Sequence, residues 1–192
     1  MRTFRRWLDD LGETLVGREF DANLVGSQYV DLGPQAARAR AIAARLNAVR
    51  DGPPKDAVVL WTTGFAAVTR KGPWIYVANV FAQRLSDDAL AFVLGHEMAH
   101  HDFGHLSTMY VAAGFLGNWQ QMELAADRRG LELSTRAGFA RAGAFEALDP
   151  QWEGDEGADP FVGWPPALAA YLNRFRRSHP PVVERRRALG AQ

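Results

Sequence analysis

The chain has 192 residues, of which 47% are hydrophobic and 23% charged, a composition typical of one soluble globular domain with a sizeable core. Basic and acidic residues each number 22, so the formal net charge is zero and no overall positive field favours a nucleic acid partner. The chain contains no cysteine, which excludes disulfides and thiolate metal ligands.

The hydrophobic segments are short. The basic N-terminus lacks the apolar run of a signal peptide, and the most hydrophobic later stretch, residues 109–117, is well below the roughly 20 residues of a spanning helix. We therefore expect a cytoplasmic protein with no membrane association encoded in this chain, or a periplasmic one if a leader has been removed.

The N-terminal half is predicted to contain one helix and a small sheet. Residues 1–33 are interrupted by glycines and are interpreted as an N-terminal extension, whereas residues 34–192 form the predicted domain. Pro34 begins an Ala/Arg-rich helix with an apolar stripe, which ends at the turn residues 51–54. Three runs rich in β-branched and aromatic residues predict an antiparallel or mixed sheet, with the middle or last strand near its edge: residues 57–62, 65–70 and 74–78.

The rest of the chain is predicted to be largely helical. Ser86 is a suitable N-cap, and Asp87 and Asp88 lie where the helix dipole favours anions. An acidic segment at residues 149–166 is rich in Gly and Pro and predicts a long surface loop. Together with the strands, the helices predict an α+β fold of several helices on a small sheet; they are expected at residues 86–105, 118–137, 139–148, 167–177 and 182–189.

An H-E-x-x-H motif lies in the first of these helices, at His96, Glu97 and His100. Residues four apart share one face of a helix, so both imidazoles can reach one metal ion. Glu97 is offset by about 100° around the helix, beside the ion, where it can take a proton from a metal-activated water. The motif predicts a zinc hydrolase if the chain supplies a third ligand.

Three candidates for the third ligand follow the motif. His101 points about 100° away from His100 around the helix. His105 is a weak candidate, because the metzincin pattern places its third histidine six residues after the second one and His105 follows after five. Glu123 lies on the next helix, and Asp127, one turn further on, can accept the other ring N–H of a ligating histidine. We interpret His101 and His105 as packing or surface residues.

Three motifs in order extend this interpretation: HEMAHHDFGH, ELAADRRG and SHPPVVERR. With them the chain resembles, over roughly residues 34–189, the HtpX and CAAX prenyl protease family of zinc metallopeptidases, which is peptidase family forty-eight of the gluzincin group. The resemblance implies a zincin-like fold with the H-E-x-x-H motif on its active-site helix. It also implies one Zn²⁺ bound by His96, His100 and Glu123, with Glu97 as general base.

The same resemblance implies roles for three further residues. Asp127 matches an aspartate that supports a metal ligand, and His179 and Arg185 match a histidine and an arginine that steady the oxyanion and the carboxylates of the site. Simpler structural roles stay open: Asp127 could pair with Arg128 or Arg129, His179 could be a turn histidine before Pro180, and Arg185 has Arg186 and Arg187 beside it.

The expected function is a zinc-dependent endopeptidase, with protein quality control as its setting. Its substrate would be an extended or unfolded polypeptide that adds to the edge of the sheet at residues 57–78. One alternative is a latent or non-catalytic metal-holding module whose acidic loop or N-terminus covers the metal. Glu97 argues against that alternative, because a non-catalytic site needs no base. A hydrolase of a non-peptide amide is a further alternative.

Overall fold

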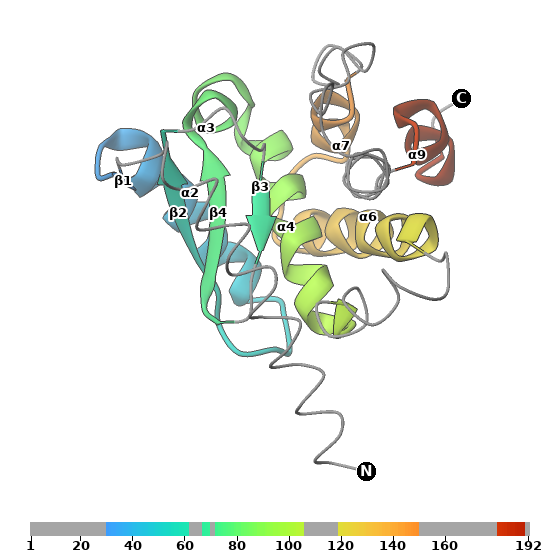
Figure 1. Ribbon diagram of the computed structural model, residues 1–192, viewed down its shortest axis with the longest axis horizontal. Helices are drawn as coiled ribbons and strands as arrows, with labels where there is room; N and C mark the ends of the chain where they lie inside the picture. The colour runs from blue at the N-terminus through green and yellow to red at the C-terminus, as the bar shows by residue number, and fades with distance from the viewer. Residues whose placement is uncertain (1–29, 62–66, 70–71, 106–118, 150–179, 191–192) are drawn as a thin grey trace, which may run out of the picture.

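The computed structural model describes residues 30–61, 67–69, 72–105, 119–149 and 180–190. His179, the helix expected at residues 167–177 and all of the expected acidic loop except Asp149 lie outside the described residues. Within the described residues the fold is α+β, as predicted, with helices packed on one small sheet (Figure 1).

The sheet has four strands in the order β1-β2-β4-β3. Their bounds are Val30–Asp31 for β1, Asp56–Leu60 for β2, Ala67–Thr69 for β3 and Trp74–Ala78 for β4. β4 pairs in parallel with β2 and antiparallel with β3, and β1 is antiparallel to β2. The sheet is therefore mixed, and the middle predicted strand lies at its edge, as expected. A purely antiparallel arrangement is wrong because β4 lies between β2 and β3.

β1 is an addition to the predicted sheet. Its two residues fall within the expected N-terminal extension of residues 1–33, yet Val30 pairs with Leu60 and Asp31 pairs with Val59. A two-residue strand carries no hydrophobic alternation, so the sequence pattern does not reveal it.

Helix α2, Pro34–Asn47, covers one face of the sheet. Its stripe of small and branched side chains includes Ile42 and Leu46, which are buried in the same core as Val59 of β2 and Val77 of β4. The predicted proline start is confirmed, since Pro34 lies in the first turn. The short helix α3, Asn79–Arg84, follows β4 directly and leads to the central helix.

Helix α4, Asp87–Asp102, is the centre of the molecule. It lies between the sheet on one side and helices α6 and α7 on the other (Figure 1). Ser86 is its N-cap, as predicted: the Ser86 hydroxyl accepts a hydrogen bond of 3.2 Å from the backbone N–H of Ala89. Every residue from Ala89 to His100 except Val93 is buried. The polar motif residues are therefore held inside a helix whose other sides belong to the core.

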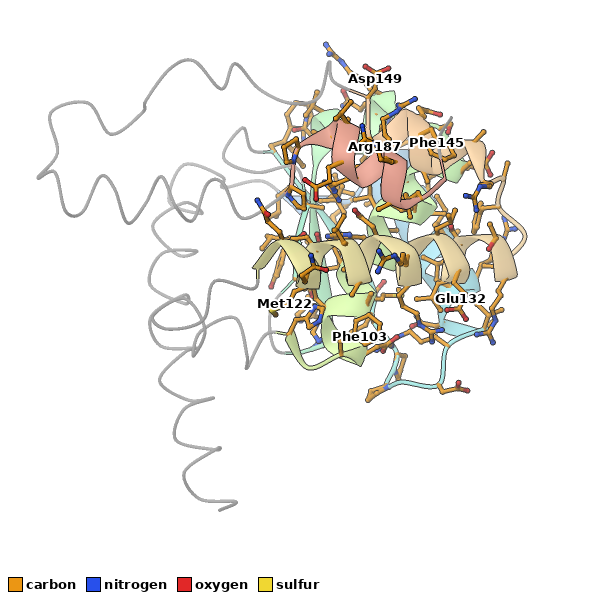
Figure 2. The ribbon with its side chains drawn as sticks, turned by 90° about the vertical axis from the view of Figure 1, so that its right-hand side faces the viewer. Phe103, Met122, Glu132, Phe145, Asp149 and Arg187 are labelled. Carbon is orange, nitrogen blue, oxygen red and sulfur yellow. The ribbon has the colours of Figure 1, made fainter. Side chains whose placement is uncertain are left out.

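Three helices complete the described fold: α6 at Trp119–Arg136, α7 at Ala142–Ala147 and α9 at Val182–Ala188. α7 packs on the start of α4, where the Glu146 carboxylate accepts hydrogen bonds from both the backbone N–H and the hydroxyl of Ser86. α9 lies beside α6 on the outer side of the molecule (Figure 2). In the part of the chain that the structure describes, no helix has the length and apolar character needed to cross a membrane.

Candidate metal centre

A close crossing of α4 and α6 builds the site. A Cβ atom placed on Gly130 of α6 would lie 2.7 Å from the backbone nitrogen of His96, and one on Gly95 of α4 would lie 2.9 Å from the carbonyl oxygen of Gly130. Such separations are too short for real Cβ contacts, so the two backbones can approach this closely only with glycine at both positions. The crossing brings Glu123 of α6 within reach of the histidines of α4.

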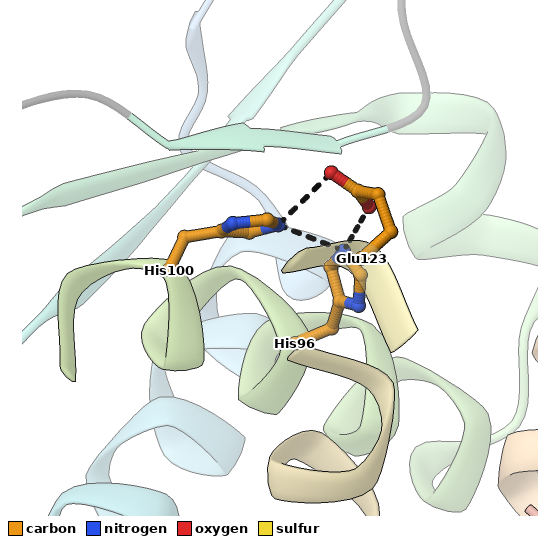
Figure 3. A group of neighbouring side chains, drawn as sticks. All are labelled: His96, His100 and Glu123. Carbon is orange, nitrogen blue, oxygen red and sulfur yellow. Dashed lines mark hydrogen bonds and ion pairs between the residues drawn. The ribbon is translucent and has the colours of Figure 1, made fainter. Parts of the chain in front are cut away.

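His96, His100 and Glu123 form a compact group of donor atoms. The Nε2 atoms of the two histidines are 3.1 Å apart. The Glu123 carboxylate places Oε2 3.2 Å from His96 Nε2 and Oε1 3.6 Å from His100 Nε2. Figure 3 shows the two rings and the carboxylate pointing toward one another. All three side chains are buried, at 5%, 4% and 2% residual exposure respectively.

These separations fit a tetrahedral metal ion. Zinc binds imidazole nitrogen and carboxylate oxygen at about 2.1 Å, so two ligands of a tetrahedron are about 3.4 Å apart. The three distances between donor atoms, 3.1, 3.2 and 3.6 Å, lie on both sides of that value. All the donor atoms of the group lie within 4.8 Å of one another. Two imidazoles and one carboxylate are also a donor set that zinc uses in hydrolases. The group could therefore hold one metal ion, with Glu123, from the neighbouring helix, as the third donor.

A chain of polar contacts supports the first histidine. His96 Nδ1 lies 2.9 Å from Oδ1 of Asp127, which is fully buried on α6 one turn after Glu123. Arg185 of α9 binds the same carboxylate through both oxygens: its Nε donates to Oδ2 at 2.8 Å and its Nη2 donates to Oδ1 at 2.5 Å. Arg185, not its neighbours Arg186 or Arg187, makes this contact, and Arg129 lies near Asp102 and Glu132 instead.

The electrostatics of the group favour a positive charge at His96. Burial alone would lower the pKa of His96, but hydrogen bonds to Asp127 and Glu123 outweigh it and raise the pKa to about 10. Burial alone would raise the pKa of Asp127, but the hydrogen bonds with Arg185 and His96 bring that pKa well below its usual range. Asp127 is thus an anion at neutral pH. Because Asp127 contacts the Nδ1 atom of His96, the Nε2 atom of the same ring faces His100 and Glu123.

His105 lies against the second histidine. Its Nδ1 atom is 3.1 Å from Nδ1 of His100, and the two rings meet edge to face with centroids 5.2 Å apart. His105 is 9% exposed. Burial is the main cause that lowers the pKa of His105 to about 4. His105 is therefore beside a donor rather than in the donor group, which agrees with its interpretation as a packing residue, although the contact with His100 was not predicted.

Gly104 is a sequence signal that α4 ends before His105. α4 ends at Asp102, and Gly104 adopts a φ of +64° in the turn that follows. A glycine shortly after a helical stretch is a common C-terminal signal, because it accepts the left-handed conformation without strain. His105 is thus not part of the helical repeat, and its spacing from His100 does not determine its direction.

His101 faces away from the donor group, as its position on the helix predicts. Its Nε2 atom makes a close contact with the Thr69 hydroxyl on β3. Burial, together with the charges of Lys55 and Arg50, lowers the pKa of His101 to about 3. The residue is therefore neutral at physiological pH and connects the edge strand to the end of α4.

Of the two remaining predicted site residues, the structure describes Glu97 but not His179. Glu97 is 8% exposed, follows His96 on α4, and contributes with Glu123 to the negative field at Arg185. His179 lies outside the described residues, one position before the buried Pro180.

Comparison with known proteins gives one match. The sequence model of Peptidase family M48 matches residues 35–121, which is less than half of the chain. This region includes the H-E-x-x-H motif and ends two residues before Glu123. The match indicates a metallopeptidase, and the geometry of Glu123, Asp127 and Arg185 extends the site beyond the matched region. No curated protein matches the sequence significantly.

Proposed function

We propose that the protein is a zinc-dependent endopeptidase of the HtpX and CAAX prenyl protease type, with a zincin-like fold. The observation that carries the proposal is the convergence of His96, His100 and Glu123 at separations suited to one tetrahedral ion. The family match over residues 35–121 supplies the reaction class. A carboxylate next in sequence to the first histidine, Glu97, supplies a base.

In the proposed peptide hydrolysis, the zinc ligands and Glu97 have separate roles. Zinc, when bound by the three donors, supplies Lewis acidity: it lowers the pKa of a water molecule and polarises the substrate carbonyl. Glu97 takes a proton from the attacking water as the carbon–oxygen bond forms, and it then delivers that proton to the amine as the carbon–nitrogen bond breaks. Two peptide ends are the products, and the base returns to its ionised form.

Asp127 and Arg185 position the ring of His96. The Asp127 carboxylate orients the ring of His96 through Nδ1, and such supporting contacts strengthen a metal ligand. The Arg185 guanidinium neutralises Asp127 inside the protein, where an unpaired carboxylate would be costly. We assign His179, by its resemblance to the family's histidine, to donate a hydrogen bond to the oxyanion.

The proposed substrate is an extended polypeptide that pairs with β3. This strand ends the strand order of the described sheet, so β4 is its one strand neighbour there. β3 also contacts α4, and Thr69 reaches His101 at the end of the motif helix. A peptide along this edge would bind mainly through its backbone, with little sequence selectivity. Protein quality control is the setting that we propose for such an activity.

The proposal is tested by measuring zinc content and cleavage of unfolded casein for the wild type and two variants. Glu97→Gln should retain zinc and lose cleavage by at least about 100-fold, the lower contribution of a general base. Glu123→Ala should lose stoichiometric zinc. Glu132→Gln, a matched change at an exposed carboxylate on α6, should behave like the wild type.

Two results would overturn the proposal. Equal cleavage by the wild type and Glu97→Gln would remove the base. A wild type that binds zinc but cleaves no peptide under any condition would identify the alternative, a latent or non-catalytic metal-holding module.

A further inference from the structure

We propose that His105 is a positioning residue that fixes the ring orientation and tautomer of His100 through a nitrogen-to-nitrogen hydrogen bond. The inference rests on the proposed metal centre, in which His100 is a ligand. His105 contacts Nδ1 of His100 in the same way that Asp127 contacts Nδ1 of His96. The two partners differ in charge, because Asp127 is an anion and His105 is neutral.

The geometry requires His100 to donate through Nδ1. Its Nε2 atom faces His96 Nε2 at 3.1 Å and the Glu123 carboxylate at 3.6 Å, so this nitrogen belongs to the donor group and must present a lone pair to a metal. A neutral imidazole that presents a lone pair at Nε2 carries its hydrogen at Nδ1. Among the residues that the structure describes, the hydrogen-bond partner of that nitrogen is His105 Nδ1, at 3.1 Å. His105 therefore accepts through Nδ1 and carries its own hydrogen at Nε2.

The backbone holds His105 in this position. The N–H of Phe103 donates to the carbonyl of Ala99 at 3.0 Å, and the N–H of Gly104 donates to the carbonyl of His101 at 3.1 Å. These bonds and the positive φ of Gly104 form the turn that ends α4 directly before His105. Phe103 packs beside the His105 ring, with centroids 5.2 Å apart. The acceptor thus follows a short hydrogen-bonded turn of the same segment that carries His100.

The two ligand histidines consequently have unlike partners. Asp127 is an anion that adds negative charge to the site and is neutralised by Arg185. His105 adds an acceptor without adding a charge. His105 thus orients the His100 ring without adding another buried carboxylate to the site. A further buried carboxylate would carry a desolvation cost.

The test compares zinc affinity in His105→Asn and His105→Leu, measured at neutral pH by competition with a chromophoric chelator. These two side chains have nearly the same shape, but only Asn places an acceptor oxygen close to the position of Nδ1. Loss of a supporting contact typically weakens metal affinity about 10–100-fold. We expect that weakening in His105→Leu and near wild-type affinity in His105→Asn. His101→Leu, the same change on the side of α4 away from the donors, is the matched control.

The outcomes separate the inference from the proposed function. Failure of the wild type to bind zinc would refute the proposed function itself. Wild-type affinity in His105→Leu, or equal weakening in His105→Leu and His105→Asn, would refute the role of His105 and leave the proposed function intact. If His105→Leu fails to fold, as judged by circular dichroism, His105→Gln replaces it, because its oxygen lies near the Nε2 position; equal affinity of the Asn and Gln variants would then refute the inference.

Discussion

Gly130 of α6 lies so close to His96 of α4 that a Cβ atom at position 130 would be 2.7 Å from the His96 backbone nitrogen. The contact is between two backbones rather than two side chains, so neither helix can relieve it by a rotamer change. Because Asp127 and Glu123 lie about one and two turns before Gly130 on α6, the same contact sets how far their carboxylates extend toward His96. Two positions without a side chain, Gly95 and Gly130, thus set how closely the candidate metal donors of the two helices approach one another.

Gly130→Ala should therefore weaken both the fold and the metal site. The substitution gains about 1 kcal/mol of helix propensity, but overpacking typically costs about 1–3 kcal/mol, and here the rigid His96 backbone must move. We expect a net loss of unfolding free energy in urea and weaker zinc binding. Arg128→Ala, on the exposed side of the same helix, should leave both quantities near their wild-type values. A Gly130→Ala protein with unchanged zinc affinity would contradict the role of the close crossing.

Arg185→Met should destabilise the protein strongly. The change leaves the buried Asp127 carboxylate without its bidentate partner, and removal of one member of a buried pair costs about 3–5 kcal/mol. The cost should be much smaller in an Asp127→Asn background, where no anion is left uncompensated. Thermal or urea unfolding of the four proteins of this double-mutant cycle measures the coupling. Arg187→Met, at an exposed position of α9, is the control, and additive effects in the cycle would contradict the pairing.

Lys55 should make stability depend on pH in the alkaline range. Burial, reinforced by the nearby charge of Arg50, lowers the pKa of Lys55 from its ordinary value of 10.5. The folded protein then releases this proton at a lower pH than the unfolded chain does. Since stability rises with pH wherever the unfolded state binds more protons, this residue should favour the folded state increasingly as pH rises toward 10.5.

The contribution of Lys55 is isolated by comparison with Lys55→Met. The difference in unfolding free energy between the wild type and Lys55→Met, followed in urea from neutral to alkaline pH, should shift in favour of the wild type as pH rises. The other titrating groups cancel in this difference. A shift of opposite sign would show that Lys55 is not desolvated in the folded protein.

The helices and much of the candidate site could be predicted from the sequence because they depend on local patterns. Ser86 has the side chain of an N-cap and does cap α4. The four-residue spacing of His96 and His100 is a property of any helix, and their Nε2 atoms do meet. The position of Glu123 required the family resemblance, since no local rule states how two helices cross. The glycine pair that permits the crossing, Gly95 and Gly130, became visible only with both helices in place.

The parallel pairing of β4 with β2 and the contact between His105 and His100 were not predicted, for different reasons. Strands adjacent in sequence usually pair, yet β4 lies between β2 and β3, and the choice depends on which strands the core helices cover. His105 was a weak candidate for the third ligand because its spacing from His100 departs from the metzincin pattern. That comparison says nothing of a contact with His100 formed after α4 has ended at Asp102.

The burial of α4 on nearly all sides has a consequence for how the protein would lose activity. A functional group on a surface loop can be lost by a local opening that spares the rest of the molecule, but here the helix with both imidazoles is shared by the main hydrophobic core and the candidate metal centre. We expect its amide hydrogens to be among the most protected from exchange, because core helices open with free energies near that of global unfolding. Heat inactivation should thus coincide with global melting rather than precede it.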